Sequence, residues 1–332
     1  MKFAGKKFVL VGGAGLIGSH TLDMLVKTDA KEIIIFDNFQ RGTEDNISQS
    51  IDDPRVQLCE AGGDILHTDV LAKAFEGAHG VFHFAALWLL HCHVHPRSAF
   101  EVNVRGTFNV LEACVANKVN RLVYSSSASV YGDAESELMD EGHPYNNKNF
   151  YGATKIASEA MVTAFHYRYG LETISLRYMN VYGPRQDYKG AYMAIIMKML
   201  DAIDQGKGPT IIGEGAEAFD FISVTDCALA NMQAMKADNV GKNYNVGTGI
   251  KTSLAQLAQK LLDLTNSDFK INFIDRPQSK LVRSRIADPS NALDEIGFKA
   301  ETNLDTGLKA LIDWRANHKA QVEALRKVRA IK

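Results

Sequence analysis

The segment VLVGGAGLIGSH, Val9 to His20, carries the features from which the architecture of this chain follows. A short apolar run leads into three glycines, and residues with helical apolar spacing come next. In a strand–turn–helix unit, Gly12 permits the tight turn, Gly15 lets backbone amides approach a pyrophosphate, and Gly18 permits close helix–strand packing. The partial positive charge of a helix N-terminus favours a bound anion there. The segment therefore predicts a dinucleotide-binding turn.

The next apolar run, Glu32 to Asp37, ends in a carboxylate roughly 20 residues beyond the glycines. At that spacing a carboxylate accepts hydrogen bonds from the ribose diol of adenosine. Its negative charge disfavours the 2′-phosphate of NADP, so NAD is the predicted cofactor. Arg41 lies close in the sequence, which keeps NADP open as an alternative.

Apolar runs alternate with segments of helical spacing through the first half of the chain. Six of these runs are expected to be buried strands: 7–13, 32–37, 56–61, 80–86, 121–127 and 173–178. This alternation predicts an α/β fold, a Rossmann-type doubly wound parallel sheet covered on both faces. After Asn180 the sequence is richer in glycine, proline and charge, which predicts a smaller C-terminal α/β substrate lobe. Residues 1–178 are assigned to the NAD-binding domain, with 226–250 returning to it, and 179–225 and 251–332 to the substrate lobe.

The composition excludes several classes of function. The chain has 332 residues, 46% of them hydrophobic, and a formal net charge of −2. This balance gives no electrostatic footprint for nucleic acid or an anionic membrane. No apolar run reaches transmembrane length, and the one near the N-terminus is too short for a secretory leader. The four scattered cysteines form no CxxC pair, so free thiols in a reducing cytoplasm are expected.

The segment NFYGATKIASEA carries Tyr151 and Lys155, which face one way if they lie on a helix. The pKa of a phenol is ordinarily about 10. A lysine ammonium and a positively charged nicotinamide nearby would lower it, which makes the pair a candidate acid/base for a hydroxyl proton. Such a pair alone is common on exposed helices. Ser127, however, ends the fifth expected strand, at the sheet edge where open α/β folds bind ligands.

A series of motifs then follows along the chain: VGGAGLIGSH, IIIFDNFQRG, HFAA, SSSASVYG, YGATK, RYMNVYGPRQ, GEGAEAFDFISVTDCA and YNVGTG. In content and order they resemble the extended short-chain dehydrogenase/reductases, in the sugar-nucleotide epimerase/dehydratase group, over almost the whole chain. The resemblance is to the UDP-glucose and UDP-glucuronate 4-epimerase type. It implies that tightly held NAD is regenerated in each turnover. Tyr151 would take the proton of the sugar 4-hydroxyl, Ser127 would polarise that oxygen, and Lys155 would hold the nicotinamide ribose.

The residues that follow Ser127 separate the branches of this group. Dehydratases carry an acidic pair there and decarboxylases a glutamate, whereas this chain has Ala128 and Ser129. Neither residue can act as an acid or base, which favours epimerisation at C4 of a nucleotide-diphosphate sugar. A nucleotide-sugar dehydratase and a 4-ketosugar reductase remain alternatives. A catalytically silent NAD-binding sensor would lack one member of the Ser–Tyr–Lys set, and all three are present.

Further site residues follow from the matching motifs. The expected cofactor-binding residues are Gly12, Gly15, Leu16, Ile17, Gly18, Asp37, Asn38, Asp64, Ile65, Ala85 and Ala86, with Tyr151 and Lys155. The expected substrate-binding residues are Ser127, Tyr178, Asn180, Arg185 and Arg276. Among these, the resemblance places Asp64 at the adenine, Arg185 within reach of a C6 carboxylate, and Arg276 on the diphosphate.

The chain also departs from the pattern of the group. Phe219 stands where relatives commonly carry a diphosphate-binding arginine, and the usual Arg-Pro-Gly-Asp ends here in Ser279. Trp88 stands where some galactose-type epimerases place a lysine. The nucleotide carrier, UDP, is therefore an expectation from the group alone.

The segment WLLHCHVHPRS contains His91, His93 and His95, which would share one face of a strand as metal ligands do. Pro96 instead marks the start of the next helix, which predicts a loop or distorted turn over 88–95. The proposed chemistry needs no metal. A sugar- or cofactor-facing role and plain packing are the other readings of these histidines.

Two expected helices bear on assembly. The helices over 99–116 and 151–169 resemble those that pair in dimers of the group, so a homodimer is expected. The alternative is that their apolar stripes only cover the sheet.

Overall fold

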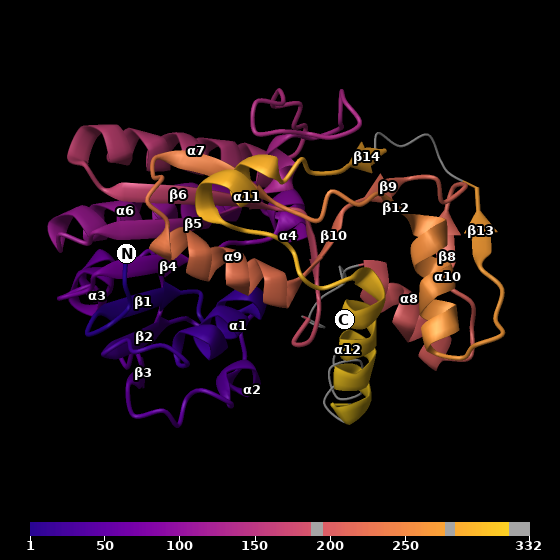
Figure 1. Ribbon diagram of the computed structural model, residues 1–332, viewed down its shortest axis with the longest axis horizontal. Coiled ribbons are helices and arrows are strands. Elements are labelled where there is room, and N and C mark those ends of the chain that lie inside the picture. Colours follow the sequence, from indigo (N-terminus) through magenta and orange to yellow (C-terminus); the bar gives the residue numbers. More distant parts are fainter. Residues whose placement is uncertain (187–194, 276–282, 319–332) are drawn as a thin grey trace.

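The computed structural model describes residues 1–186, 195–275 and 283–318. Its centre is a sheet whose strands are all parallel and lie in the order β11-β6-β5-β4-β1-β2-β3 (Figure 1). Their bounds are β1 Lys7–Val11, β2 Glu32–Phe36, β3 Val56–Leu58, β4 Gly80–His83, β5 Arg121–Ser127, β6 Glu172–Tyr178 and β11 Lys242–Val246. The predicted Rossmann-type parallel sheet is confirmed.

Helices cover both faces of this sheet. The helices that pack on it are α1 Leu16–Leu25, α3 Thr68–Ala74, α6 Thr107–Ala116, α7 Phe150–Tyr169 and α9 Val224–Lys236, while the short α2, Glu44–Ile47, lies beside α1. On β1, Phe8 and Leu10 join the core formed with α1 and α9, whereas Val9 and Val11 join the core formed with α3, α6 and α7. Successive strand residues point to opposite faces, so a strand buried on both faces is apolar throughout.

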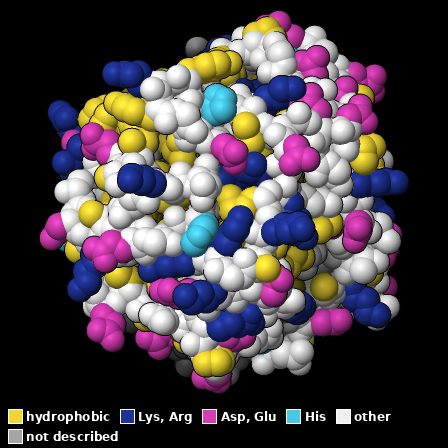
Figure 2. Space-filling model, turned by 60° about the vertical axis from the view of Figure 1, so that its left-hand side comes forward, with side chains coloured by type: hydrophobic (Ala, Val, Ile, Leu, Met, Phe, Trp, Pro, Cys, Tyr) yellow, Lys and Arg dark blue, Asp and Glu magenta, His cyan; other side chains and the backbone are white. Residues whose placement is uncertain are grey.

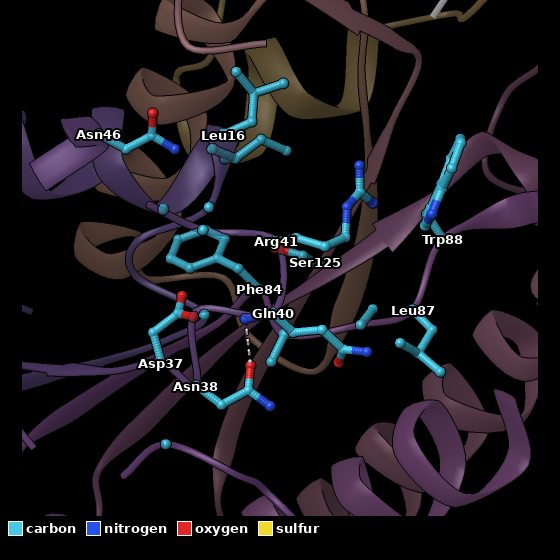
Figure 3. Close-up of a pocket in the computed structure, with 18 of the residues that line it drawn as sticks. Leu16, Asp37, Asn38, Gln40, Arg41, Asn46, Phe84, Leu87, Trp88 and Ser125 are labelled. Carbon is cyan, nitrogen blue, oxygen red and sulfur yellow. Dashed lines mark hydrogen bonds between the residues drawn. The ribbon is translucent and has the colours of Figure 1, made fainter. Parts of the chain in front are cut away.

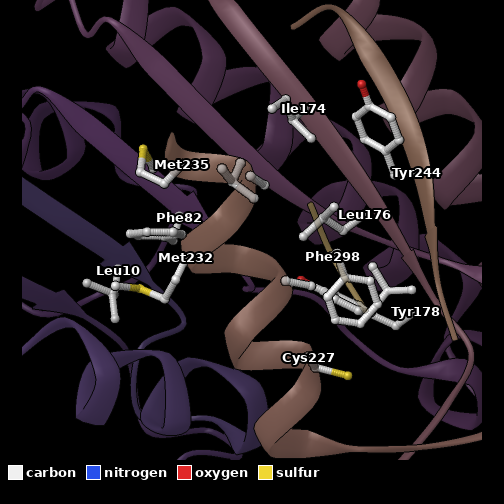
Figure 4. Packing of buried hydrophobic residues seen from close by; sticks show 14 of the residues in the cluster. Leu10, Phe82, Ile174, Leu176, Tyr178, Cys227, Met232, Met235, Tyr244 and Phe298 are labelled. Atoms are coloured by element: carbon white, nitrogen blue, oxygen red, sulfur yellow. The ribbon is translucent and has the colours of Figure 1, made fainter. Parts of the chain in front are cut away.

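The first of these cores is rich in methionine and aromatic side chains. Met232 and Met235 of α9 lie over Leu10 and Phe82 of the sheet, as Figure 4 shows. Burying side chains of this size stabilises the fold by about 1.5–3 kcal/mol each relative to leaving them in water. α9 and β11 thus attach the segment around 226–250 to the sheet. The domain boundaries themselves stay a prediction.

The smaller C-terminal lobe has its own core between helices and short strands. Its helices are α8 Ile195–Asp204, α10 Leu254–Leu264 and α12 Leu304–Asn317, with α11 Ser290–Ile296 nearer the large sheet. Its strand pairs are β7 Asn180–Tyr182 with β10 Phe221–Ser223, and β8 Thr210–Ile212 with β13 Asn272–Ile274. A three-stranded sheet completes it, in the order β12 Thr252–Ser253, β9 Ala218–Phe219 and β14 Ser284–Arg285.

The expectation of a loop over residues 88–95 is wrong, because most of this segment is helical. It forms α4, Leu89–Val94, followed by α5, Pro96–Ala99, and a π-helical segment, Phe100–Gly106, that runs into α6. Pro96 occupies the first turn of α5, as the sequence indicated. Burial of Cys92 against Leu87 gives the short α4 an apolar anchor.

Charges of both signs are mixed on the face of the molecule that Figure 2 shows. Figure 2 shows lysine and arginine side chains interspersed with aspartate and glutamate across one face, rather than gathered by sign. Within the described residues no helix is both long and apolar enough to pass through a bilayer.

Candidate active site

The glycine turn between β1 and α1 has no room for side chains at two positions. A Cβ on Gly12, whose φ is +81°, would lie 2.6 Å from the backbone nitrogen of Ala85. A Cβ on Gly18 would lie 2.4 Å from the carbonyl oxygen of Gly12. The first glycine therefore permits the turn and the third permits close packing, while Gly15 caps α1.

Asp37 is held at the end of β2 by backbone amides. Its Oδ2 accepts a hydrogen bond from Ala14 N at 2.9 Å, and its Oδ1 accepts one from Phe39 N at 2.8 Å. Burial raises the pKa of the Asp37 carboxyl, and these two hydrogen bonds oppose that rise. Each carboxylate oxygen has a further lone pair, so the group can still accept hydrogen bonds from a diol.

A cavity of about 350 Å³ extends from this turn to α7 (Figure 3). Every residue expected to bind the cofactor lines it: Gly12, Gly15, Leu16, Ile17, Gly18, Asp37, Asn38, Asp64, Ile65, Ala85, Ala86, Tyr151 and Lys155. Phe84, in the HFAA motif, lines it as well. The sequence analysis missed other lining residues: Gln40, Gly42, Thr43, Asn46, Gly63, Leu87, Val102, Ser125, Ser126, Gln186 and Trp314. Most of these flank recognised motifs. Trp314 belongs to α12, and no local signal could have placed it here.

Arg41 and Trp88 also line the cavity and contact each other across it. The guanidinium carbon of Arg41 lies 4.7 Å from the centroid of the Trp88 ring. Figure 3 shows the Arg41 side chain extending toward Trp88 and away from the Asp37 carboxylate. This direction favours a diol over a 2′-phosphate beside Asp37, because the cation that would receive the phosphate is turned to the other side of the cavity.

Ser127 ends β5 and caps the 3₁₀ turn Ala128–Val130. Its Oγ accepts a hydrogen bond from Ser129 N at 3.1 Å. Because Ser127 Oγ is the acceptor in this hydrogen bond, the hydroxyl proton of Ser127 can be donated to another group. Ser127 itself does not line the 350 Å³ cavity, whereas its neighbours Ser125 and Ser126 do.

Lys155 lies on α7 with 3% of its surface exposed. Its Nζ donates a hydrogen bond to Ser125 O at 2.6 Å and lies 4.9 Å from the ring centroid of Tyr124 and 5.7 Å from that of Tyr151. Burial lowers the pKa of Lys155 to about 8. Burial therefore makes the charged ammonium costly in free energy. Among the described residues it donates one hydrogen bond, to Ser125 O, so its remaining N–H groups can bind further oxygens.

Tyr151 differs from the sequence-based expectation in one respect. Burial raises the pKa of Tyr151 to about 12, while a hydrogen bond with the Ser127 hydroxyl and the charges of Arg41 and Arg285 oppose the rise. Tyr151 packs against the small apolar cluster around Leu87, which removes water from the phenol. The expected lowering of this pKa is therefore not produced by the protein's own groups, since desolvation exceeds their combined effect.

Helix α7 is tied to the segment after β4 by Asn103. Its side chain accepts a hydrogen bond from Leu87 N at 2.7 Å and donates to Leu87 O at 2.9 Å and to Thr154 Oγ1 at 3.1 Å. Asn103 lies in the π-helical segment, and such segments often occur at functional sites. This amide fixes the position of Tyr151 relative to the cavity wall.

The residues expected to bind substrate do not all line the cavity. Tyr178 lines the cavity, but its hydroxyl donates to Asn231 Oδ1 at 2.9 Å. Asn180 is not among the lining residues. Arg185 lines the cavity beside α1, where its Nη2 lies 2.7 Å from Asp23 Oδ2. Arg276 and Ser279 fall outside the described residues.

The three histidines do not share a face. His91 and His95 lie one turn apart, with ring centroids 5.1 Å from each other, while His93 points elsewhere around α4. Across the described ranges, no set of three or more histidine, cysteine, aspartate or glutamate side chains is arranged to hold a metal ion.

Burial of Lys155 should make stability depend on pH. The folded-state pKa, about 8, lies below the ordinary value of 10.5, so the unfolded chain binds more protons between these pH values. The contribution of Lys155 to the free energy of unfolding should therefore rise as pH increases through this window. Urea unfolding of NAD-free protein checks this at about pH 7 and about pH 9.5. The free energy of unfolding of Lys155→Met minus that of the wild type should be larger at the lower pH than at the higher pH. A difference that does not change with pH would contradict the assignment.

Residues 8–247 match the model of the NAD dependent epimerase/dehydratase family. The chain belongs to this family. It is 30% identical over 338 residues to a UDP-glucose 4-epimerase of Rhizobium leguminosarum bv. trifolii, covering 94% of this chain and 98% of that protein. NAD is thus its cofactor, as the sequence predicted.

Solved structures agree with this assignment. UDP-N-acetylglucosamine 4-epimerase from Methanobrevibacter ruminantium M1, in complex with UDP-N-acetylmuramic acid, superposes with a TM-score of 0.89 at 31% identity, covering 96% of this chain and 100% of that one. UDP-glucuronic acid 4-epimerase from Bacillus cereus, with UDP-glucuronic acid and NAD, gives a TM-score of 0.84 at 26% identity, covering 94% and 99%. The extended short-chain dehydrogenase/reductase resemblance is confirmed.

Proposed function

We propose that this protein inverts C4 of a UDP-sugar through a transient 4-keto intermediate. The observation that carries the proposal is the arrangement of Ser127, Tyr151 and Lys155 at the end of the NAD-fitting cavity, with no acid or base in the two residues after Ser127. The side chains of the family relatives' site are thus present, without the additions that elimination or decarboxylation needs.

The residues around the cavity fit NAD. The glycine turn admits a pyrophosphate, the Asp37 carboxylate can accept from a ribose diol, and Lys155 can donate to a second ribose. Bound NAD would supply reversible hydride transfer at the sugar carbon. This group supplies the redox chemistry, and the chain supplies orientation and proton transfer.

The three side chains divide the proton chemistry at the C4 oxygen. Ser127 donates to that oxygen the proton that otherwise lies in its hydrogen bond with Tyr151, since its own oxygen is already bonded to Ser129 N. Tyr151 takes the hydroxyl proton and gives it back, and the Lys155 ammonium favours the phenolate. Burial raises the pKa of Tyr151 to about 12, and the positive charge of a bound oxidised cofactor would oppose that rise.

Elimination of water would need another carboxylate near Tyr151. Glu159 lies on the same helix but is buried against Arg177, with Oε2 2.8 Å from Nη2, and Tyr145 donates to the same carboxylate. It is therefore committed to structure. Ala128 and Ser129 are buried and neutral.

The test is incubation with UDP-hexoses and UDP-hexuronates without added NAD, followed by proton NMR. Inversion at C4 supports the proposal. A product with a new double bond or lost oxygen indicates a dehydratase. Turnover that needs added oxidised NAD and leaves a 4-keto sugar with an equal amount of NADH indicates a ketosugar reductase running in reverse. Either result would refute the epimerase assignment.

We infer a homodimer that pairs the π-helical segment with α6 and α7. Large apolar side chains stand exposed on these elements, including Phe100, Phe108 and Tyr167, the last with 81% of its surface exposed. Unpartnered aromatic groups of this size favour an interface. Light scattering of Phe108→Glu should show a shift toward monomer. Leu293→Glu serves as the control, because it adds the same charge at an exposed apolar residue of α11, outside these elements.

The proposed compartment is the cytoplasm. All four cysteines are free thiols, and Cys92, Cys114 and Cys227 are buried. Burial raises the pKa of the Cys92 and Cys114 thiols, which keeps them unreactive and suits a reducing environment. Fractionation of the source cells would test this.

A further inference from the structure

Arg285 occupies β14, at the edge of the three-stranded sheet in the C-terminal lobe (Figure 1). β14 runs parallel to β9, and Arg285 is the register partner of Phe219. Paired residues on neighbouring strands place their side chains on the same face of a sheet. Arg285 therefore supplies a cation on the face where Phe219 supplies none.

The surroundings of Arg285 differ from those of the other buried arginines. Four arginines with little exposed side chain each contact a carboxylate within 3.0 Å: Arg121 with Glu172, Arg177 with Glu159, Arg185 with Asp23 and Arg315 with Asp201. Arg285 makes no salt bridge within the ranges that the structure describes, and its Nε is buried without a hydrogen-bond partner. An unpartnered buried donor costs free energy that a bound anion would recover.

Two charged or ionisable groups act on Arg285, namely Tyr151 and Asp133. Asp133 is already engaged, because its Oδ1 accepts hydrogen bonds from the backbone nitrogens of Arg283 at 2.8 Å and Ser284 at 3.4 Å. The influence on Tyr151 is mutual, since the charge of Arg285 lowers the pKa of the phenol. Asp133 follows Ser127 by six residues, so its two hydrogen bonds join β14 to the segment that carries the Ser127 hydroxyl and place Arg285 on that side of the site.

We propose that Arg285 binds a carboxylate carried by the sugar ring, so that the preferred substrate is an acidic nucleotide sugar. The inference rests on the proposed C4 epimerisation and names its substrate class. With Tyr151 at the C4 oxygen, an anion on Arg285 belongs to a substituent on the C4 side of the ring. The diphosphate leaves from C1, at the opposite corner. Arg185, first considered for such a carboxylate, is held by Asp23.

Calorimetry with two matched pairs of probes tests the proposal: UDP-glucuronate against UDP-glucose, and UDP-N-acetylmuramate against UDP-N-acetylglucosamine. Arg285→Gln should weaken binding of an acidic member by about 10- to 100-fold, as expected for a lost charge-assisted hydrogen bond. Its neutral match should change by no more than about twofold. A loss of affinity for UDP-glucuronate would place the bound carboxylate at C6. A loss for UDP-N-acetylmuramate would place it on the lactyl group at C3.

Arg283→Gln is the matched control, because it removes the same charge from an exposed side chain two residues away. It should leave all four affinities unchanged. An equal loss on acidic and neutral probes for Arg285→Gln would place Arg285 on the diphosphate and overturn the proposal, as would no loss on any probe. Should Arg285→Gln fold poorly, Arg285→Lys must keep the preference for the acidic probe in weakened form. Binding is read without turnover, so absence of C4 inversion in the wild type would refute the proposed function separately.

Discussion

Tyr151→Phe should reduce C4 inversion by at least about 10²- to 10⁴-fold, the usual contribution of a general acid–base group. The substitution removes one oxygen and keeps the ring that packs against the apolar cluster around Leu87. NAD should remain bound, because the glycine turn, Asp37 and Lys155 are untouched. Measuring kcat by proton NMR and the NAD released on heat denaturation separates the chemical step from cofactor binding.

Tyr124→Phe is a suitable control for this experiment. Tyr124 is also buried beside the Lys155 ammonium, but it lies on β5 and is not among the residues that line the cavity. It should keep kcat within a few-fold of the wild type. Activity retained in Tyr151→Phe would show that another group carries the proton. Loss of NAD along with activity would assign the phenol a binding role.

Glu159→Gln should lower the free energy of unfolding by about 3–5 kcal/mol, because it leaves the Arg177 guanidinium buried without a counter-charge. The side chains of Arg177 and Glu159 are 2% and 3% exposed and are joined by two hydrogen bonds, at 2.9 and 2.8 Å. Urea unfolding at neutral pH measures the change.

The exposed pair of Lys242 and Glu295 provides the comparison, since its side chains are 53% and 28% exposed. Lys242→Gln should cost no more than about 1 kcal/mol, because solvent screens the charges and each partner is readily hydrated alone. Similar losses in the two variants would show that Arg177 finds water or another acceptor when Glu159 is neutralised.

The cofactor half of the site could be predicted because its requirements are local. Gly12 permits the tight turn, Gly18 avoids contact with the carbonyl oxygen of Gly12 in the same strand–turn–helix unit, and Asp37 follows the next strand. Spacing along the chain fixes such positions once the strand and helix are recognised. The parallel sheet followed for the same reason, since β1 is apolar at successive positions and must be buried on both faces.

The substrate half could not be predicted in this way. Arg185 was expected at the sugar, but its motif gave no indication of the ion pair with Asp23 of α1. Trp314 reaches the cavity from α12 with no motif at all. These contacts depend on how the C-terminal lobe is placed against the sheet, which is a property of packing between distant segments.

The pKa of Tyr151 shows the same division. The sequence spacing predicted that Lys155 lies one helical turn from Tyr151, and the charge of Lys155 favours a lower pKa of Tyr151. The burial of Tyr151 beside Leu87 and Cys92 could not be predicted from the sequence, and burial has the larger effect on this pKa. Desolvation is the sum of many surrounding atoms, most of them far away along the chain. The amino-acid order thus specified the fold and the cofactor and singled out the candidate reacting side chains, whereas the electrostatics of those side chains and the position of Arg285 arise only when distant segments of the chain pack together.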